Sequence, residues 1–197
     1  MNRSQLVLAS LTLALVTTLT AQPPAGPKPA VPPSNNRVSP HETTYARVGT
    51  DRNASLITII YGRPYSKDPK SGEIRKIWGG LVKWDKAERM GADEATTILT
   101  HQSLVFGATT IPAGVYTLYI VPSENGTSKL AFSSHVAKWG IPVDETHDVA
   151  RIDLKKDTLE TQLDQLQIGI ETNPPAGGTL VIAWEKTKFS AAFTTAK

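Results

Sequence analysis

Cysteine is absent from all 197 residues of the chain. Its absence excludes disulfide bonds, a thiolate zinc site, a cysteine nucleophile and attachment to a membrane through a lipidated cysteine. The fold must therefore depend on its hydrophobic core alone. A chain of this length is long enough to bury one.

The sequence patterns of common catalytic sites are missing as well. There is no Gly-x-Ser-x-Gly, Ser-x-x-Lys or His-Glu-x-x-His pattern, and no phosphate-binding glycine loop. Charge of one sign is not in large excess, because the formal net charge is only +3 and basic and acidic residues are interspersed. We therefore expect neither nucleic acid as a partner nor a bound cofactor.

One long apolar run is present, and it lies at the N-terminus. Leu6–Leu19 follows a short start that carries Arg3 and precedes Ala21. This order predicts a secretory signal peptide over residues 1–21, cleaved near Ala21 or Gln22. A membrane anchor is the alternative, but the run is shorter than the roughly 20 residues of a membrane-spanning helix. We expect an exported bacterial protein, periplasmic or extracellular, whose mature chain has no integral membrane span.

Residues 22–39 are rich in proline. Proline fixes φ and removes a backbone donor, so this stretch is expected to be an extended, semi-rigid linker. A disordered tail is the alternative interpretation. In either case the folded domain is predicted to occupy residues 40–197.

Most of the remaining chain alternates apolar and polar residues with period two, which is typical of half-buried strands. Asn125-Gly126 adds a strong hairpin signal, and single helical turns are weaker candidates at Ser134–Trp139 and Thr158–Leu163. Such strands must bury their apolar faces against each other, which predicts an all-β, antiparallel β-sandwich in one domain. About nine strands are expected, over residues 43–48, 56–61, 96–106, 115–121, 129–133, 151–155, 166–170, 180–184 and 189–193.

Residues 62–94 interrupt this alternation with Gly, Pro, charge and tryptophan. Irregular connections of this length are uncommon in compact domains and are usually functional or disordered. This one carries too much apolar surface to stay solvated. We expect it to pack on one sheet through Ile77 and Trp78, with Trp84, between Lys83 and Asp85, as an exposed stacking surface.

The end of this segment holds the strongest candidate for a site, formed by Arg89, Asp93 and Glu94. Three interpretations stay open: a salt-bridged clamp, a recognition site in which arginine binds an anion, and a catalytic acid–base pair. Because a buried arginine without a partner is costly, we expect Asp93 or Glu94 within salt-bridge distance of another group. That group would be Arg63, Arg75 or Arg89.

The histidines lack the local spacing of metal ligands. The four are His41, His101, His135 and His147. His101 is expected to face solvent in mid-strand. The loop Asp144–Asp148 contains three carboxylates that suit a hard cation such as calcium, but it lacks the spacing of a dedicated calcium loop. A solvated acidic loop is favoured, and no metal site is predicted.

Five motifs occur in a recognisable order: Tyr61-Gly62-Arg63-Pro64, Arg75-Lys76-Ile77-Trp78-Gly79-Gly80-Leu81-Val82, Arg89-x-Gly91-Ala92-Asp93-Glu94-Ala95-Thr96, Ile111-Pro112-Ala113-Gly114-x-Tyr116 and a late Trp184. From about Ser39 to Phe193 the chain resembles the exported bacterial family known as domain of unknown function 2911. Family members commonly read Pro-x-Gly-x-x-Trp-Arg before Asp93, whereas this chain has Glu88 in place of that tryptophan. The resemblance implies that Trp84 would take over any stacking on a ligand. It implies fold and export, and no established activity.

Three functions follow from these residues. The preferred one is a non-catalytic module that binds a small anionic or polyhydroxylated ligand, such as a glycan. The second is a hydrolase or lyase in which His41 exchanges protons with Asp93 or Glu94, which requires hydrogen-bond reach between them. The third is a structural or assembly protein tethered by the proline-rich arm, although a monomer is expected. The predicted ligand-binding residues are Arg63, Arg75, Trp84, Arg89, Asp93 and Glu94.

Overall fold

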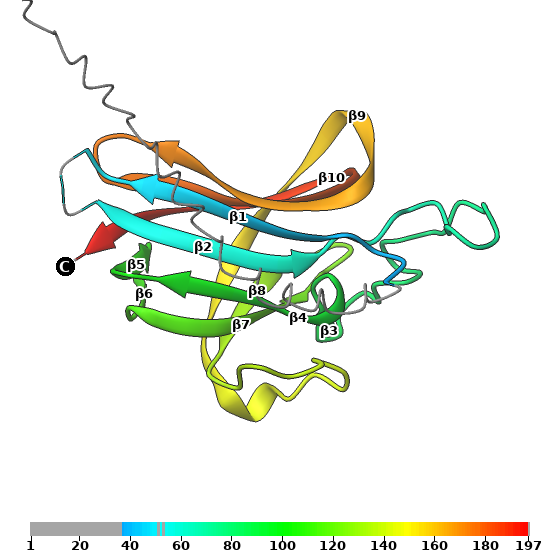
Figure 1. Cartoon of the computed structure of the whole chain (residues 1–197), viewed down its shortest axis with the longest axis horizontal. Coiled ribbons are helices and arrows are strands. Elements are labelled where there is room, and N and C mark those ends of the chain that lie inside the picture. The colour runs from blue at the N-terminus through cyan, green and yellow to red at the C-terminus, as the bar shows by residue number, and fades with distance from the viewer. Residues whose placement is uncertain (1–36, 51, 53, 197) are drawn as a thin grey trace, which may run out of the picture. The chain divides into compact units, whose positions relative to one another are not determined.

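The computed structural model describes residues 37–50, 52 and 54–196 (Figure 1). The predicted signal peptide and most of the proline-rich segment lie outside the described residues. The elements are β1 (His41–Val48), β2 (Ser55–Gly62), β3 (Glu88–Arg89), β4 (Ala92–Thr100), β5 (Ser103–Phe106), β6 (Thr109–Ile111), β7 (Gly114–Val121), β8 (Ser128–Ser133), the 3-10 turn η1 (Glu145–His147), β9 (Asp148–Asn173) and β10 (Gly177–Ala196). None of the described residues forms a helix long and apolar enough to cross a membrane.

Hydrogen bonds join the strands in the order β1-β2-β4-β7-β8-β9-β10-β5-β6, and β3 pairs with β7. All of these pairings are antiparallel. Strand β9 belongs to both layers, because its first residues pair with β8 and its later residues pair with β10. It runs across the height of the view in Figure 1. The predicted all-β, antiparallel, sandwich-like architecture is confirmed.

The core lies between the two layers and consists of the inward residues of the alternating strands. In β2, for example, Ile57, Ile59 and Tyr61 are buried. Burying a side chain of this size contributes about 1.5–3 kcal/mol. Three phenylalanines connect the layers: the ring of Phe106 lies 5.8 Å from that of Phe132 and 5.3 Å from that of Phe193.

The two predicted helical turns are wrong. Thr158–Leu163 lies inside β9, where Leu163 pairs with Glu185 across a register shift, and Ser134–Trp139 is an irregular bend. Pairing with β10 outweighs a weak local preference for helix, since tertiary context overrides propensity. The predicted strand 96–106 is divided at the exposed His101, which lies in a bend and not in mid-strand.

The segment 62–94 packs on the domain as predicted. Ile77 is fully buried and Trp78 nearly so, and the Trp78 ring contacts Phe189 edge-on at 5.0 Å. Trp84 differs from the expectation, because it is half-buried and stacks on Trp78 at 6.3 Å with an interplanar angle of 21°. The amine of Lys156 lies over its other surface at 4.8 Å. Trp84 therefore extends the core and is not an exposed platform.

Candidate functional site

Arg89 binds backbone carbonyl groups of two segments, residues 91–93 and the segment that contains Trp139. From β3 its guanidinium donates to the carbonyl oxygens of Gly91 (3.2 Å) and Trp139 (2.9 Å), and also to that of Asp93. It also lies 5.2 Å from the ring of Trp139, a cation–π distance. Partial burial lowers the pKa of Arg89. The side chain thus fixes residues 134–144, the segment after β8, to the start of β4.

The predicted ion pair between this arginine cluster and Asp93 or Glu94 is wrong. Glu94 instead pairs with Arg37, and Arg63 pairs with Glu42 at 2.9 Å. Arg89 is satisfied by carbonyl oxygens, which accept its hydrogen bonds without neutralising its charge. The clamp therefore exists, but backbone groups supply its acceptors.

Arg75 is likewise without a carboxylate partner among the described ion pairs. Its Nη2 donates to the carbonyl of Tyr65. Its Nε is buried and has no hydrogen-bond partner in the described part of the chain. An unpaired buried donor is costly, and none of the described residues accepts a hydrogen bond from this Nε.

Arg75 and Arg89 line the same hollow, which has a volume of about 430 Å³. Lys70 adds a third cation, against the carboxylates Asp68 and Glu88. Two backbone N–H groups, of Ser71 and Lys70, bind Asp68 and lower its pKa. The apolar part of the lining comes from Pro64, Leu81, Val82, Ala92, Ile141 and Trp184.

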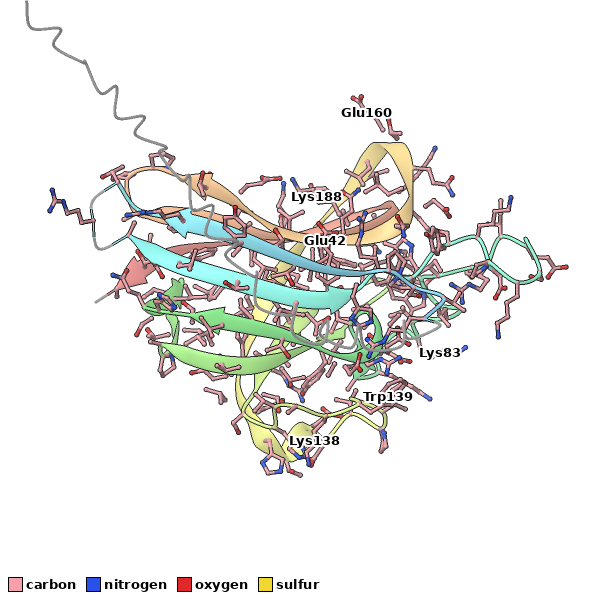
Figure 2. The ribbon with its side chains drawn as sticks, in the orientation of Figure 1. Glu42, Lys83, Lys138, Trp139, Glu160 and Lys188 are labelled. Carbon is pink, nitrogen blue, oxygen red and sulfur yellow. The ribbon has the colours of Figure 1, made fainter. Side chains whose placement is uncertain are left out.

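Arg89 also lines a second hollow of about 270 Å³, together with residues of the segment 134–144. Arg89 and Ile141 line both hollows. Trp139 and Ile141 are 55% and 61% exposed, so this segment presents apolar surface beside the two cavities. Figure 2 shows Trp139 and Lys138 together on the segment between β8 and β9. Sequence reasoning missed these residues, although two large apolar side chains in a polar loop were a usable signal.

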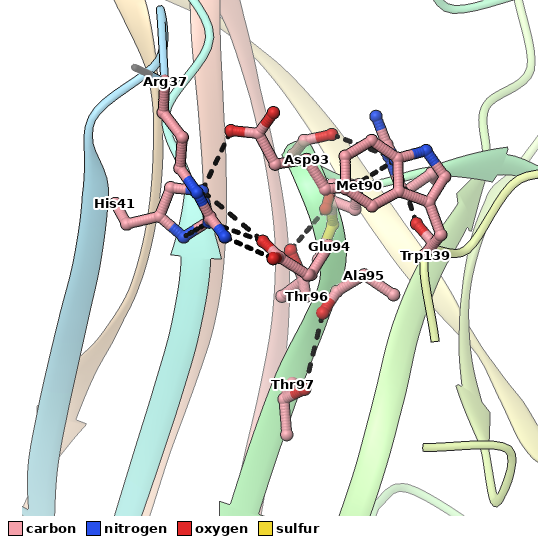
Figure 3. A network of polar contacts seen from close by, with 11 residues as sticks. Arg37, His41, Met90, Asp93, Glu94, Ala95, Thr96, Thr97 and Trp139 are labelled. Carbon is pink, nitrogen blue, oxygen red and sulfur yellow. Dashed lines mark hydrogen bonds and ion pairs between the residues drawn. The ribbon is translucent and has the colours of Figure 1, made fainter. Parts of the chain in front are cut away.

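A different cluster forms around His41 at the start of β1 (Figure 3). Its Nε2 lies 3.0 Å from Oδ2 of Asp93 and 3.8 Å from Oε2 of Glu94. Asp93 has a left-handed φ of 61°, so the chain is not extended there. Both carboxylates therefore approach the same imidazole, although successive residues of an extended strand would point to opposite sides.

Arg37 completes this cluster. It binds both carboxylate oxygens of Glu94, with Nη1 2.6 Å from Oε2, and its Nη1 is also 2.7 Å from Nε2 of His41. The hydrogen bond from Arg37 lowers the pKa of Glu94. Arg37 belongs to the segment predicted as a linker, and no local pattern marked it. None of the four residues of this cluster lines the two hollows beside Arg89.

A network beside the smaller hollow was also missed. Tyr119 lines that hollow and donates its hydroxyl hydrogen to Asp148, at 2.6 Å from Oδ1. Arg151 donates to the same hydroxyl at 2.8 Å and to Asp148 at 2.7 Å, and pairs with Glu145. Burial and the Asp148 carboxylate raise the pKa of Tyr119. Tyr119 therefore stays protonated near neutral pH.

The six predicted ligand-binding residues thus separate into three groups. Arg75 and Arg89 share a hollow, Asp93 and Glu94 face His41, and the other two have structural contacts. Arg63 is paired with Glu42 and donates to the carbonyl of Leu166, while Trp84 stacks on Trp78. The structure brings together two smaller sites in place of one large site.

Together these observations define an all-β, sandwich-like domain with two hollows that share one arginine in their lining. The chain belongs to the family described as protein of unknown function (DUF2911), whose model matches residues 39–193. This confirms the resemblance seen in the motifs. No curated protein and no solved structure shows significant similarity to the chain.

Proposed function

We propose that this domain is a non-catalytic binding module that acts after export, in the periplasm or outside the cell. Its ligand is a small anion held in the hollow of about 430 Å³ between Arg75 and Arg89. The observation that carries the proposal is that both arginines line one hollow while neither forms an ion pair within the described residues. Their charge is therefore available to a ligand.

The lining also limits the kind of anion. A guanidinium binds carboxylate or phosphate through two parallel hydrogen bonds, and two guanidinium side chains, Arg75 and Arg89, line this hollow. Leu81, Ile141 and Trp184 supply apolar surface, which suits the carbon face of a sugar ring or a short acyl chain. An acidic monosaccharide or a sugar phosphate satisfies both features.

Isothermal titration calorimetry on the chain beginning at Gln22 tests this proposal with glucuronate, glucose 6-phosphate, acetate and uncharged glucose as probes. We expect a charged sugar to bind more tightly than glucose. Arg75→Gln should weaken that binding by about tenfold or more, because a hydrogen bond to a charged group contributes about 1.5–3 kcal/mol.

Arg63→Gln is the matched control, because Arg63 pairs with Glu42 and does not line this hollow. Its affinity should equal that of the unaltered domain. Equal effects of the two substitutions, or no binding by any charged probe, would contradict the proposal.

A hydrolase or lyase is the second candidate, supported by the 3.0 Å contact between His41 and Asp93. A histidine within hydrogen-bond reach of a carboxylate has the geometry for proton transfer. Hydrolysis of p-nitrophenyl acetate by the unaltered domain and by His41→Gln separates this candidate from the binding module. Activity that disappears with His41→Gln and persists with Arg75→Gln would favour the enzyme.

A further inference from the structure

Two histidines and one aspartate converge where the segment after β8 returns to β9. His135 follows β8, Asp144 precedes η1 and His147 ends η1. Oδ2 of Asp144 lies 3.6 Å from Nδ1 of His135 and 3.5 Å from Nε2 of His147. Each residue offers one possible ligand atom, and these three atoms all lie within 4.8 Å of one another. Asp144 and His147 are three residues apart, but His135 lies outside their loop, so local spacing could not predict the full cluster.

These distances match a divalent transition-metal site. Zinc binds imidazole nitrogen and carboxylate oxygen at about 2.0–2.2 Å, which places two ligands of a tetrahedral ion roughly 3.3–3.6 Å apart. The two Asp144–histidine distances, 3.6 and 3.5 Å, fall within that range. The three ligand atoms lie within 4.8 Å of one another, so the two imidazoles must move closer together to bind one ion.

The carboxylate is already oriented for this role. Oδ1 of Asp144 accepts hydrogen bonds from the backbone N–H of Thr146 at 3.1 Å and from its hydroxyl at 2.5 Å. This leaves Oδ2 directed at the two histidines. Outer contacts of this kind orient metal ligands and affect metal affinity.

The backbone holds the two histidine segments together independently of any metal. The N–H of Ser134 donates to the carbonyl of His147 at 2.9 Å, and its hydroxyl donates to the same oxygen at 3.1 Å. All three side chains are also accessible, with 35%, 39% and 49% of the His135, Asp144 and His147 side chains exposed. An ion can therefore enter without opening the fold.

The same region does not suit calcium, the cation considered from the sequence. Two of the three carboxylates of Asp144–Asp148 are occupied, because Glu145 and Asp148 both pair with Arg151. A single free carboxylate with two imidazoles favours a borderline transition metal, whereas calcium takes six to eight oxygen ligands.

We propose that His135, Asp144 and His147 form a binding site for a divalent transition-metal ion of the zinc type, with solvent or another ligand completing the coordination. His135 and Asp144 also line the hollow of about 270 Å³, so the remaining coordination position borders that cavity. The ion would connect both ends of the segment that carries Trp139 and Ile141.

Equilibrium dialysis of the EDTA-treated chain beginning at Gln22 against Zn²⁺ tests this site. We expect one tightly bound ion per chain. His135→Gln and His147→Gln should each weaken binding by more than about tenfold, while circular dichroism shows an unchanged fold. His101→Gln is the control, because His101 is exposed in the β4–β5 bend, and it should bind like the unaltered chain.

Co²⁺ provides a second readout. Its visible absorption reports ligand number and geometry, and the spectrum of the unaltered chain should change in both ligand variants and not in His101→Gln. Thr146→Val, which removes one contact to Asp144, should weaken Zn²⁺ binding by about tenfold. Binding that is equal in all variants, or that His101→Gln reduces as much as His135→Gln, would overturn the proposal.

Discussion

At the scale of single residues, Arg89 has a structural role that its contacts with backbone carbonyl groups define. Its planar guanidinium reaches three carbonyl oxygens in fixed directions, which the flexible ammonium of a lysine cannot reproduce. Arg89→Lys should therefore lower the free energy of unfolding by about 1–3 kcal/mol. Urea unfolding followed by tryptophan fluorescence measures this, with Lys86→Arg at an exposed position as the control. An unchanged stability would show that the three contacts contribute nothing.

The lowered pKa of Glu94 predicts that the free energy of unfolding depends on pH. Its hydrogen bond from Arg37 lowers its pKa in the folded state. A carboxyl with a lowered folded pKa contributes stability above its unfolded pKa, near 4.3, and loses that contribution as the pH falls through the folded value. Arg37→Gln should therefore be less stable than the unaltered domain at pH 7. The difference should disappear in acid, as measured by urea unfolding across this range.

Gly62 is required by a close backbone approach. A Cβ at this position would lie 2.3 Å from the carbonyl oxygen of Ala92, where β2 pairs with β4. Gly62→Ala should lower the free energy of unfolding by about 1–3 kcal/mol, since the strands must move apart. Gly169→Ala, in β9, has no heavy atom within 4 Å of the new Cβ and should have little effect. Equal losses in the two variants would contradict this account.

At the scale of elements, Trp78 holds the segment 62–94 against the rest of the domain. Trp78 contacts Trp84, Trp184 and Phe189, and its indole N–H donates to the carbonyl of Trp184 at 3.3 Å. Trp78→Ala should cost about 3–5 kcal/mol of unfolding free energy. Ile74→Ala, at an exposed position of the same segment, should change it by less than about 0.5 kcal/mol. Chemical unfolding followed by circular dichroism compares the two.

The alternation of apolar residues predicted most strands, because a strand with one buried face has apolar residues at every second position. It divided β9 and β10 into four shorter strands, since the polar residues between Lys155 and Leu166 interrupt the pattern. Those residues are mostly exposed and still pair with β10 at several points. Hydrogen bonding between backbones extends a strand without leaving a signal in its side chains.

The sites were predicted in part, for a related reason. The approach of Asp93 and Glu94 to His41 was anticipated as a condition for catalysis, and the geometry meets it. The partners of Arg89 are carbonyl oxygens, which every residue has, so sequence cannot identify them. The same limit applies to Arg37, and to His135, which meets Asp144 and His147 only through the fold.

At the scale of the whole molecule, Phe106 connects the two layers through Phe132 of β8 and Phe193 of β10. Phe106→Ala should lower the free energy of unfolding by about 3–5 kcal/mol. The loss of hydrogen-exchange protection should be greatest in β5, β6 and the end of β10. Phe106→Leu keeps most of the buried volume and should lose less. Uniform loss of protection across all strands would show that the layers do not separate locally.

The pairing of β10 with β5 has a consequence for how the chain folds. Val105 of β5 pairs with Thr194 of β10. The hairpin of β5 and β6 therefore pairs with a strand that lies far away in the sequence. Pairings between distant parts of a chain form slowly, because loop-closure entropy is lost before contacts compensate for it. Until then the edge of β5 is open to any other strand. The rate at which this late pairing forms, as well as the final stability, therefore affects how much of the chain reaches the native state.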